Sequence, residues 1–267
     1  MRAVVAFCRR AMALGAPFYL VARTAVDPIF RTAYAQNVVA TRAEDALQVD
    51  DVERCLQILQ QTTGLDQYII CPTSEFFDLF MLENPALFAR YSGHIPLVDL
   101  ATYRCVSNKA SFTALCAQHG LAVPRIVERP EGLTYPFVAK PQDNLGANGR
   151  ILYPHLIFND ENWHHFLAAE NPNDFFFQEY ITGRSFYLLF YLSRSGTVTA
   201  FSQENLAQQA GGKSIVFART AHIHELPIAG EYVKLLQSLD FHGLAMIELK
   251  RAQTSADLVF IKLNPRF

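Results

Sequence analysis

The sequence has no excess of basic residues and no block of like charges. Its 267 residues include 23 Lys and Arg against 25 Asp and Glu, which gives a formal net charge of -2. Proteins that bind nucleic acids neutralise the phosphates with clustered positive charge. A nucleic-acid partner is therefore not expected.

Cysteine pairs and long apolar runs are also absent. The five cysteines are widely scattered and include no Cys-x-x-Cys pair, which is typical of reduced, buried thiols in a cytoplasmic protein. No window reaches the roughly 18 apolar residues that a membrane span needs, and Arg9 and Arg10 interrupt any signal-peptide core at the N-terminus. The sequence therefore predicts a soluble cytoplasmic protein without a membrane partner.

Helices and strands are predicted to alternate over the first hundred residues. The spacing of apolar residues predicts helices over 2–14 and 50–61, and short apolar runs predict strands at 18–22, 37–40 and 68–72. Such alternation is typical of a doubly wound parallel sheet.

Three polar residues, Thr73, Ser74 and Glu75, follow the last of these strands. The carboxyl ends of parallel strands are where such sheets bind ligands. A helix N-cap followed by an acid in the first turn accounts for the same residues and is the favoured interpretation.

The segment from 137 to 153 contains a candidate phosphate-binding loop. A short apolar strand at 137–141 carries Lys140 and leads into a polar loop with Gly146 and Gly149, before a second predicted strand at 151–153. Glycines let backbone N–H groups approach phosphate oxygens, and a strand lysine adds positive charge. A plain hairpin turn would use the same residues, so this motif alone does not decide between the two.

The last two predicted strands carry polar residues that suit a metal-bound phosphate. Glu248 lies within an apolar strand at 245–249, where an acid is costly unless it has a partner such as a metal ion. The last strand ends in Asn264, Pro265 and Arg266, which places a neutral oxygen ligand and a guanidinium together at a strand end.

These motifs, in their order along the chain, resemble those of the ATP-grasp superfamily, of the carbamoyl-phosphate-synthase-like and carboxylate–amine ligase type. The resemblance includes an Asn-Lys pair at 108–109 that opens a predicted helix and a Gly-Leu-x-Val-Pro sequence at 120–124 after it. It also includes a strand at 175–181 that matches the ATP-grasp hinge. The resemblance covers residues 104–267 well and the first hundred residues more loosely.

The resemblance implies an α/β fold with two domains. Residues 1–103 would form an N-terminal doubly wound parallel-sheet domain, the pre-ATP-grasp domain, and residues 104–267 a two-lobed α+β ATP-grasp domain. Relatives begin with a strand before the first helix and continue beyond Asn-Pro-Arg. A first strand and a C-terminal part are therefore expected to be missing from this chain.

The resemblance also implies roles for individual residues. Glu248 and Asn264 would hold Mg2+, or Mn2+ in its place, and Arg266 would contact the transferring phosphoryl group. Lys213, in a loop of small residues, would meet phosphate or the substrate carboxylate, although a solvated loop lysine explains it equally well. The residues implied in binding ATP are Lys109, Lys140, Gly146 and Gly149 at the phosphates, Gln178, Glu179, Tyr180 and Ile181 at the adenine, and Ser185 at the ribose.

Two positions depart from the family pattern. Ser185 stands where an acid normally binds the ribose, and Lys262 stands where a second acid normally binds the metal. Because side chains two residues apart on a strand share a face, Lys262 is predicted to lie beside Asn264 and near Glu248. It is either a substitute cation that neutralises phosphate charge or half of a salt bridge in a protein that no longer catalyses.

The reaction that the resemblance implies is an ATP-dependent ligation. ATP phosphorylates a carboxylate, and an amine or similar nucleophile attacks the acylphosphate, leaving ADP and phosphate. The partners would be small-molecule carboxylate and amine substrates, and self-association into homo-oligomers stays open. A catalytically impaired homologue that binds nucleotide without turnover is the alternative, and a periplasmic-type binding protein is a third interpretation that leaves Lys140 unexplained.

Two other groups of residues are weaker candidates. His222 and His224 could bind one zinc ion from one strand with Glu225, an interpretation that is not favoured. The aromatic residues at 175–177 are predicted to be core and not a base-stacking surface, because no basic residues lie between them.

Overall fold

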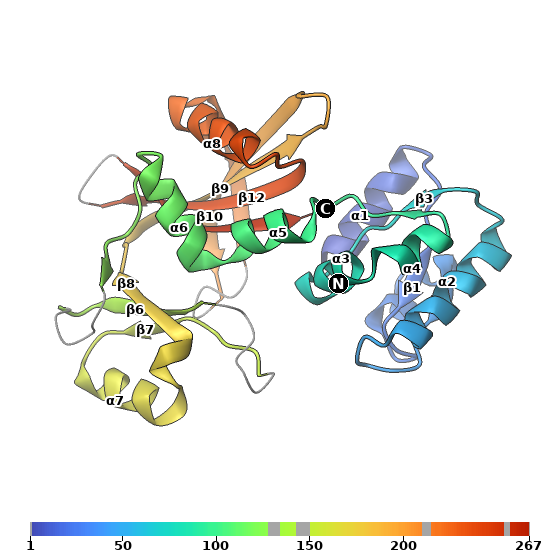
Figure 1. Ribbon diagram of the computed structural model, residues 1–267, viewed down its shortest axis with the longest axis horizontal. Coiled ribbons are helices and arrows are strands. Elements are labelled where there is room, and N and C mark those ends of the chain that lie inside the picture. Colours follow the sequence, from blue (N-terminus) through green and yellow to red (C-terminus); the bar gives the residue numbers. More distant parts are fainter. Residues whose placement is uncertain (1, 128–133, 143–149, 210–214, 254–256, 267) are drawn as a thin grey trace. The chain divides into compact units, whose positions relative to one another are not determined.

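The fold is that of a computed structural model, which describes residues 2–127, 134–142, 150–209, 215–253 and 257–266. The chain divides into two compact units, Met1–Pro96 and Leu97–Phe267. Figure 1 labels many of the helices and strands of both units.

The first unit contains short helices and two pairs of short strands. β1 pairs with β2 and β3 pairs with β4, in both cases in parallel. Its elements are α1 (Arg2–Ala13), β1 (Leu20–Ala22), the 3-10 helices η1 (Pro28–Arg31) and η2 (Ala35–Asn37), β2 (Val38–Thr41), α2 (Val49–Thr63), β3 (Tyr68–Ile69), α3 (Glu75–Glu83), α4 (Pro85–Arg90) and β4 (Gly93–His94).

The predicted helices of the first unit are confirmed. α1 covers the segment expected at 2–14, and α2 covers the one expected at 50–61 and ends at Gly64, whose φ of 63° is a conformation that favours glycine. The hydroxyl of Ser74 accepts a hydrogen bond from the backbone N–H of Phe77 at 3.3 Å. Ser74 therefore caps α3, and the helix-cap interpretation of this residue is confirmed.

The strands of the first unit form two separate pairs instead of one doubly wound sheet, as far as the described residues show. The predicted parallel direction is confirmed. β3 and β4 are each two residues long, and Pro72 follows β3 closely. Proline has no N–H and restricts the residue before it, so it limits how far the ladder can extend.

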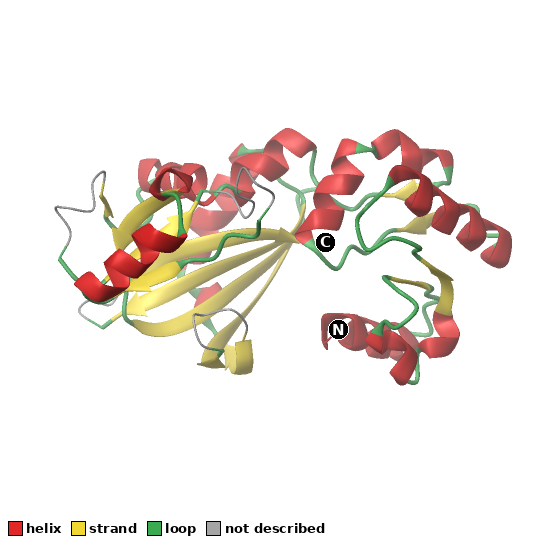
Figure 2. Ribbon diagram, turned by 90° about the horizontal axis from the view of Figure 1, so that it is seen from below, coloured by secondary structure: helices red, strands yellow, loops and turns green. Residues whose placement is uncertain are grey.

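The second unit contains two antiparallel sheets (Figure 2). The smaller sheet has the strand order β5-β8-β6-β7, and the larger sheet has the order β11-β10-β9-β12-β13. The helices are α5 (Leu100–Ser107), α6 (Lys109–Gln118), α7 (Asp160–Ala169), α8 (Pro227–Ser238), and the 3-10 helices η4 (Pro172–Asp174) and η6 (Ile223–Glu225). The strands are β5 (Ile126–Val127), β6 (Phe137–Pro141), β7 (His155–Ile157), β8 (Phe175–Glu179), β9 (Gly183–Leu192), β10 (Val198–Gln208), β11 (Ile215–Ala221), β12 (Gly243–Ala252) and β13 (Leu258–Arg266).

Helix α7 covers one face of the smaller sheet with an aromatic core. Phe166 of α7 packs against Phe175 and Phe177 of β8, with ring centroids 5.0 and 6.1 Å apart. Phe175 and Phe177 are buried, which confirms the prediction that they are core residues. Because side chains alternate along a strand, Gln178 of β8 points to the other face, and so does Lys140 of β6.

Helices α6 and α8 cover one face of the larger sheet. Phe112 of α6 and Tyr232 of α8 both contact Phe260 of β13, with ring centroids 5.4 and 6.4 Å apart. Phe260 lies opposite Leu249 of β12, which is fully buried. Glu248, the neighbour of Leu249 on the strand, therefore points to the face away from these helices.

Two details of the sequence predictions are wrong. No strand forms at 151–153, where Ile151 makes only an isolated bridge, and β7 begins at His155. Pro154 lies between the two, and it has no N–H to donate to the ladder with β6. The cysteines are free, as predicted, but Cys105 is exposed on α5 because it lies on the side of that helix away from its packed face.

Among the described residues, no helix is both long and apolar enough to cross a membrane.

An ion-pair clamp joins the three strands β9, β10 and β11. The buried carboxylate of Glu204 accepts hydrogen bonds from Nε and Nη2 of Arg184 at 2.5 and 2.8 Å, and Nε of Arg219 donates to it at 2.8 Å. The hydrogen bonds from Arg184 and Arg219 lower the pKa of Glu204 to about 2, against the opposing effect of burial. The clamp therefore keeps its negative charge over the whole neutral range.

Replacing Glu204 by glutamine is expected to lower the free energy of unfolding at pH 7 by about 1–3 kcal/mol. This expected loss is smaller than the cost of breaking a fully buried ion pair, because both arginine side chains are about half exposed. The stabilisation is present above pH 4.5 and is lost as the pH falls towards 2, so the difference between the two proteins should shrink over that window. Urea unfolding at pH 7 and pH 3 measures it, with Glu231→Gln on the exposed side of α8 as the control. An unchanged difference at the two pH values would contradict the prediction.

Candidate nucleotide site

The larger sheet carries a polar patch on the face away from α6 and α8, here called the Glu248 patch. Glu248 lies opposite Lys262 on β13 and opposite Tyr187 on β9, and Lys250 lies opposite Ser185. Directly opposed residues share a face of a sheet, so these five side chains project from the same side. Nζ of Lys262 lies 3.4 Å from Oε2 of Glu248, which confirms the proximity predicted from the strand spacing.

Lys140 reaches this patch from the smaller sheet. It is 8% exposed, and its Nζ donates a hydrogen bond to the carbonyl oxygen of Ile261 on β13 at 2.9 Å. Burial lowers the pKa of Lys140 to about 7, and the negative charge of Glu248 opposes that effect. Three further lysines lower the pKa as well, and they are Lys262, Lys109 and Lys250. Lys140, Lys250 and Lys262 therefore lie near Glu248, and Lys109 adds a positive charge near Lys140. This excess of positive charge suits a polyanion such as a triphosphate.

Lys250 connects the larger sheet to the segment between β8 and β9. Its Nζ donates a hydrogen bond to the carbonyl oxygen of Ile181 at 2.9 Å and lies 5.1 Å from the centre of the Tyr180 ring. Burial lowers the pKa of Lys250, against the effect of Glu248. Lys250 is not among the residues predicted from the sequence, although its position two residues after Glu248 on a strand places it on the same face.

Ser185 is buried on β9 beside Glu248. Its Oγ accepts hydrogen bonds from Nδ2 of Asn205 at 2.9 Å and from Nε2 of Gln208 at 3.1 Å, and it donates towards Oε1 of Glu248 at 3.5 Å. The hydroxyl is thus part of a network that orients the Glu248 carboxylate. Asn205 and Gln208 are not among the site residues predicted from the sequence, although Gln208 directly precedes the loop of small residues that contains Lys213.

Gln178 is buried in the smaller sheet, and its amide has no hydrogen-bond partner among the described residues. It is 1% exposed, and neither its Oε1 nor its Nε2 makes a hydrogen bond to a described residue. It lies opposite Val138, which shares a face of β6 with Lys140. A buried polar group without a partner costs about 1–3 kcal/mol. The amide would recover that energy from a ligand that offers both a donor and an acceptor.

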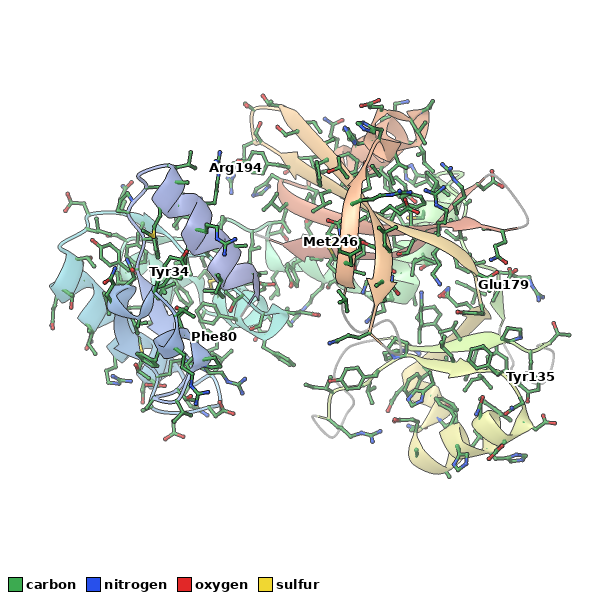
Figure 3. All side chains as sticks on the ribbon, turned by 180° about the vertical axis from the view of Figure 1, so that it is seen from behind. Tyr34, Phe80, Tyr135, Glu179, Arg194 and Met246 are labelled. Carbon is green, nitrogen blue, oxygen red and sulfur yellow. The ribbon has the colours of Figure 1, made fainter. Side chains whose placement is uncertain are left out.

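Asn264 has a second amide group of this kind. Its Nδ2 is buried and makes no hydrogen bond to any described residue. Asn264 lies opposite Met246, which is two residues before Glu248 on β12 and is labelled in Figure 3. The backbone of Arg266 pairs with Leu244 at the end of β13, whereas the side chain of Arg266 lies outside the described residues.

The remaining predicted residues fall into three groups. Lys109 is the first residue of α6, which Asn108 caps, and it lies close enough to Lys140 to affect its pKa. Glu179 ends β8 (Figure 3), and its backbone N–H donates to the carbonyl oxygen of Arg125 at 2.9 Å. Tyr180 and Ile181 follow it in the connection to β9. The residues Gly146, Gly149 and Lys213 lie outside the described part of the chain.

The histidines considered for zinc lie elsewhere. Possible ligand atoms of His222, His224 and Glu225 lie within 4.8 Å of one another, but on the 3-10 helix η6 and not on the expected strand. Nδ1 of His224 shares a hydrogen bond of 2.7 Å with Oγ of Ser202. Ser202 is two residues from Glu204 on β10, so this cluster belongs to the other face of the larger sheet.

No family model and no curated protein sequence matches this chain. Solved structures do match it. The biotin carboxylase domain of 2-oxoglutarate carboxylase from Hydrogenobacter thermophilus, a dimer with MgADP, ADP and bicarbonate, matches with a TM-score of 0.69 at 14% identity, over 97% of this chain and 60% of that one. Biotin carboxylase from Campylobacter jejuni in a β-γ-ATP complex matches with a TM-score of 0.68 at 14% identity, over 97% of this chain and 62% of that one.

A third similar structure is the ADP complex of N5-carboxyaminoimidazole ribonucleotide synthetase, with a TM-score of 0.65 at 16% identity, over 96% of this chain and 66% of that one. These proteins are members of the ATP-grasp superfamily. This chain thus has a mixed α/β fold that matches ATP-grasp proteins, which confirms the resemblance at the level of the fold. It spans less than two thirds of the length of each of these three.

Proposed function

We propose that the second unit binds ATP with Mg2+ and that the chain is an ATP-dependent ligase. It would join a carboxylate to an amine or similar nucleophile through an acylphosphate and release ADP and phosphate. The observation that carries the proposal is the meeting of Lys140, from the smaller sheet, with the Glu248 patch of the larger sheet. The adenine nucleotides bound in the similar structures support the same assignment.

The buried lysines would hold the phosphates. A triphosphate beside Lys140 would raise its pKa again, because an adjacent anion favours the charged ammonium. Lys109, near Lys140, would act on the same phosphates, together with backbone N–H groups of the loop that contains Gly146 and Gly149. The unpartnered amide of Gln178 and the backbone of residues 179–181 would hold the adenine.

Glu248 and Asn264 would hold the magnesium ion together with phosphate oxygens and water. Magnesium sites commonly use one or two carboxylates plus substrate phosphates, so the single carboxylate of this patch is sufficient. The bound ion would neutralise charge on the transferring phosphoryl group. Ser185 would orient Glu248 and also offer its hydroxyl to the ribose. Arg266 would contact the phosphoryl group and Lys213 the phosphate or the substrate carboxylate.

The organisation of the whole chain belongs to the same proposal. Residues 1–103 would be a pre-ATP-grasp domain and residues 104–267 the ATP-grasp domain. The enzyme would act in the cytoplasm on small-molecule carboxylate and amine substrates, as a monomer or as a homo-oligomer.

Thermal unfolding of the whole chain with ATP, with and without Mg2+, tests the proposal. We expect ATP to raise the Tm by a few degrees and Mg2+ to increase the shift, because a ligand that binds only the folded state stabilises it by mass action. A Lys234→Met variant, altered on the exposed side of α8, should respond like the wild type. The absence of any shift with ATP would overturn the nucleotide site.

A specific observation favours a second candidate function. The ammonium of Lys262 already neutralises Glu248, at 3.4 Å, where a catalytic site would need the carboxylate for metal. If this salt bridge keeps Glu248 from binding the metal ion, the chain would bind nucleotide without turnover. ADP release in the presence of a panel of carboxylates and amines distinguishes the two, since only the ligase produces ADP that depends on both substrates.

A further inference from the structure

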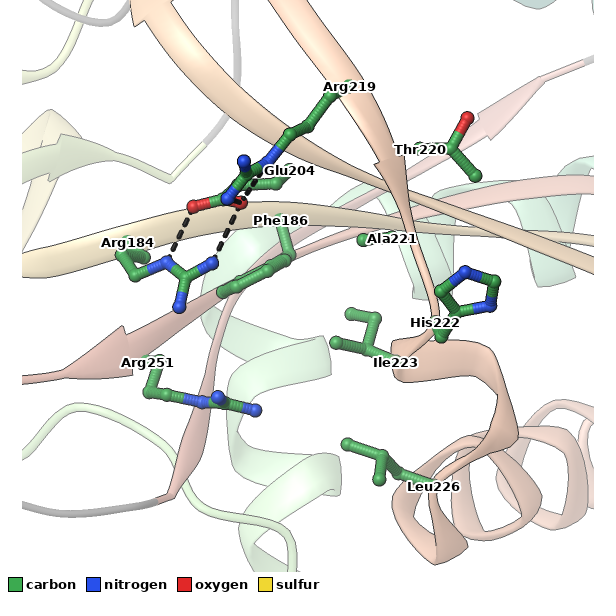
Figure 4. A pocket seen from close by; sticks show the side chains of 10 residues that line it. All are labelled: Arg184, Phe186, Glu204, Arg219, Thr220, Ala221, His222, Ile223, Leu226 and Arg251. Atoms are coloured by element: carbon green, nitrogen blue, oxygen red, sulfur yellow. Dashed lines mark hydrogen bonds and ion pairs between the residues drawn. The ribbon is translucent and has the colours of Figure 1, made fainter.

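A second charged site lies on the opposite face of the larger sheet from the Glu248 patch. An open cleft of ≈ 470 Å³ is present there (Figure 4). This volume falls within the range of small-molecule sites. The cleft is lined by Arg184, Arg219 and Arg251 with Glu204, and by the apolar side chains of Phe186, Ile223 and Leu226 among others.

The cleft carries an excess of positive charge. Glu204 supplies one negative charge, which its low pKa maintains. Arg184 and Arg219 both bind Glu204 and remain more than half exposed. The three guanidinium groups and this one carboxylate leave two positive charges without a counter-charge among these four residues.

Arg251 is the residue that the clamp does not use. Its side chain makes no hydrogen bond and no ion pair with the described residues, and its Nε is buried without a hydrogen-bond partner. Its guanidinium lies 5.6 Å from the centre of the Phe186 ring, and that of Arg184 lies 5.4 Å from the same ring. Arg184 and Arg251 are directly opposed in the sheet, and the guanidinium groups of both lie near the same aromatic ring.

The rest of the cleft is apolar. Figure 4 shows Arg184 and Arg251 on one side of the cleft, and Ile223 and Leu226, from η6 and the start of α8, on the other. An anion held by the arginines would therefore place its attached group against Phe186, Ile223 and Leu226.

We propose that this cleft binds a phosphate monoester carried on an apolar or aromatic group. The two excess positive charges match a phosphate monoester dianion, and the planar guanidinium suits phosphate oxygens better than an ammonium does. The apolar wall selects against free inorganic phosphate. This inference goes beyond the proposed ligase activity and does not depend on it.

The ligand of this cleft does not react at the nucleotide site. Arg184 precedes Ser185, Arg251 follows Lys250 and Glu204 precedes Asn205, and neighbours on a strand point to opposite faces. The sheet itself thus separates the cleft from the Glu248 patch. The phosphate monoester would thus occupy a site separate from the one proposed for ATP.

Calorimetric titration of the whole chain with phenyl phosphate tests the site. We expect saturable binding, weaker binding of inorganic phosphate, and none of phenol. Arg251→Gln should weaken the binding of phenyl phosphate by about tenfold to a hundredfold, the scale of charge-assisted hydrogen bonds to an anion. It should change the Tm of the unliganded protein only slightly, because Arg251 holds no ion pair with a described residue and contributes mainly its contact with the Phe186 ring. Arg194→Gln removes a charge at the other end of β9 and serves as the matched control.

Saturating ATP and the variant Lys140→Met should leave the affinity for phenyl phosphate unchanged. Competition by ATP, or a loss of binding in Lys140→Met, would place the probe at the nucleotide site and overturn the proposal. Equal losses in the Arg251 and Arg194 variants, equal affinity for inorganic phosphate, or no saturable binding would overturn it as well.

Discussion

Replacing Lys140 by methionine is expected to abolish the stabilisation by ATP and, at the same time, to make the unliganded protein more stable at pH 6. The two effects have one cause. Burial lowers the pKa of Lys140 to about 7, so the folded protein carries the energetic cost of a buried ammonium until a polyanion compensates for it. Methionine has a similar length and no charge, and it removes both the cost and the attraction for phosphate.

The pH dependence of this effect has a definite sign. The pKa of the lysine in the unfolded chain is 10.5, above the value in the folded protein. The folded state therefore binds fewer protons than the unfolded state between pH 7 and 10.5, and the stability of the wild type should rise with pH over that window. Below pH 7 the full cost, on the order of a few kcal/mol, is present. The gain from Lys140→Met should be largest at pH 6 and small near pH 10.

Thermal unfolding of the wild type and of Lys140→Met at pH 6 and pH 9, with and without ATP, measures both effects. Lys234→Met, on the exposed side of α8, controls for the loss of a lysine as such. A variant that is less stable than the wild type at pH 6 would show that the hydrogen bond to Ile261 outweighs the cost of burial. A variant that keeps the full ATP response would remove Lys140 from the phosphate site.

The elements of the chain could largely be predicted from the sequence, because their signals are local. Apolar runs predict β12 and β13, and the two-residue spacing of Lys262 and Asn264 predicts that they share a face. The difference at β7 has an equally local cause, because Pro154 has no N–H to donate to the ladder with β6. The division of the first unit into two strand pairs could not be predicted in this way, because no local signal in the sequence specifies which strands pair.

The site itself could be predicted only in part. Family motifs mark Lys140 and Glu248, but their meeting depends on how two sheets pack, which spacing along the chain does not show. Ser185, Asn205 and Gln208 form one hydrogen-bond network from two strands, and this network follows from the register of β9 and β10 alone. The arginine cleft was missed for the same reason, since three strands contribute one arginine each.

Replacing Lys262 by glutamate is expected to make the stabilisation by ATP depend strongly on Mg2+, whereas the wild type should show only a weak dependence. The substitution restores the acid of the family pattern and leaves two carboxylates, Glu248 and residue 262, directly opposed on neighbouring strands. Like charges in this position repel each other, so the unliganded variant should be less stable than the wild type. A divalent ion relieves that repulsion. We expect Mg2+ to bind about tenfold more tightly in the presence of ATP, because the number of charged ligands tunes the affinity of oxygen-ligand sites over orders of magnitude.

Titration of Mg2+ against the Tm at saturating ATP, in wild type, Lys262→Glu and Lys262→Gln, separates the effects of gaining an acid and of losing a cation. Glutamine removes the salt bridge to Glu248 without adding a carboxylate, so it should fall between the other two. An equal response in all three proteins would place the metal away from Glu248.

The release of ADP by the same three proteins decides what Lys262 does. If the lysine only forms a salt bridge in a chain that has lost its metal ligand, glutamate should raise the rate of ADP release. If the lysine neutralises the transferring phosphoryl group in place of a second metal contact, both variants should be slower than the wild type, because a positive charge aimed at the transition state is lost.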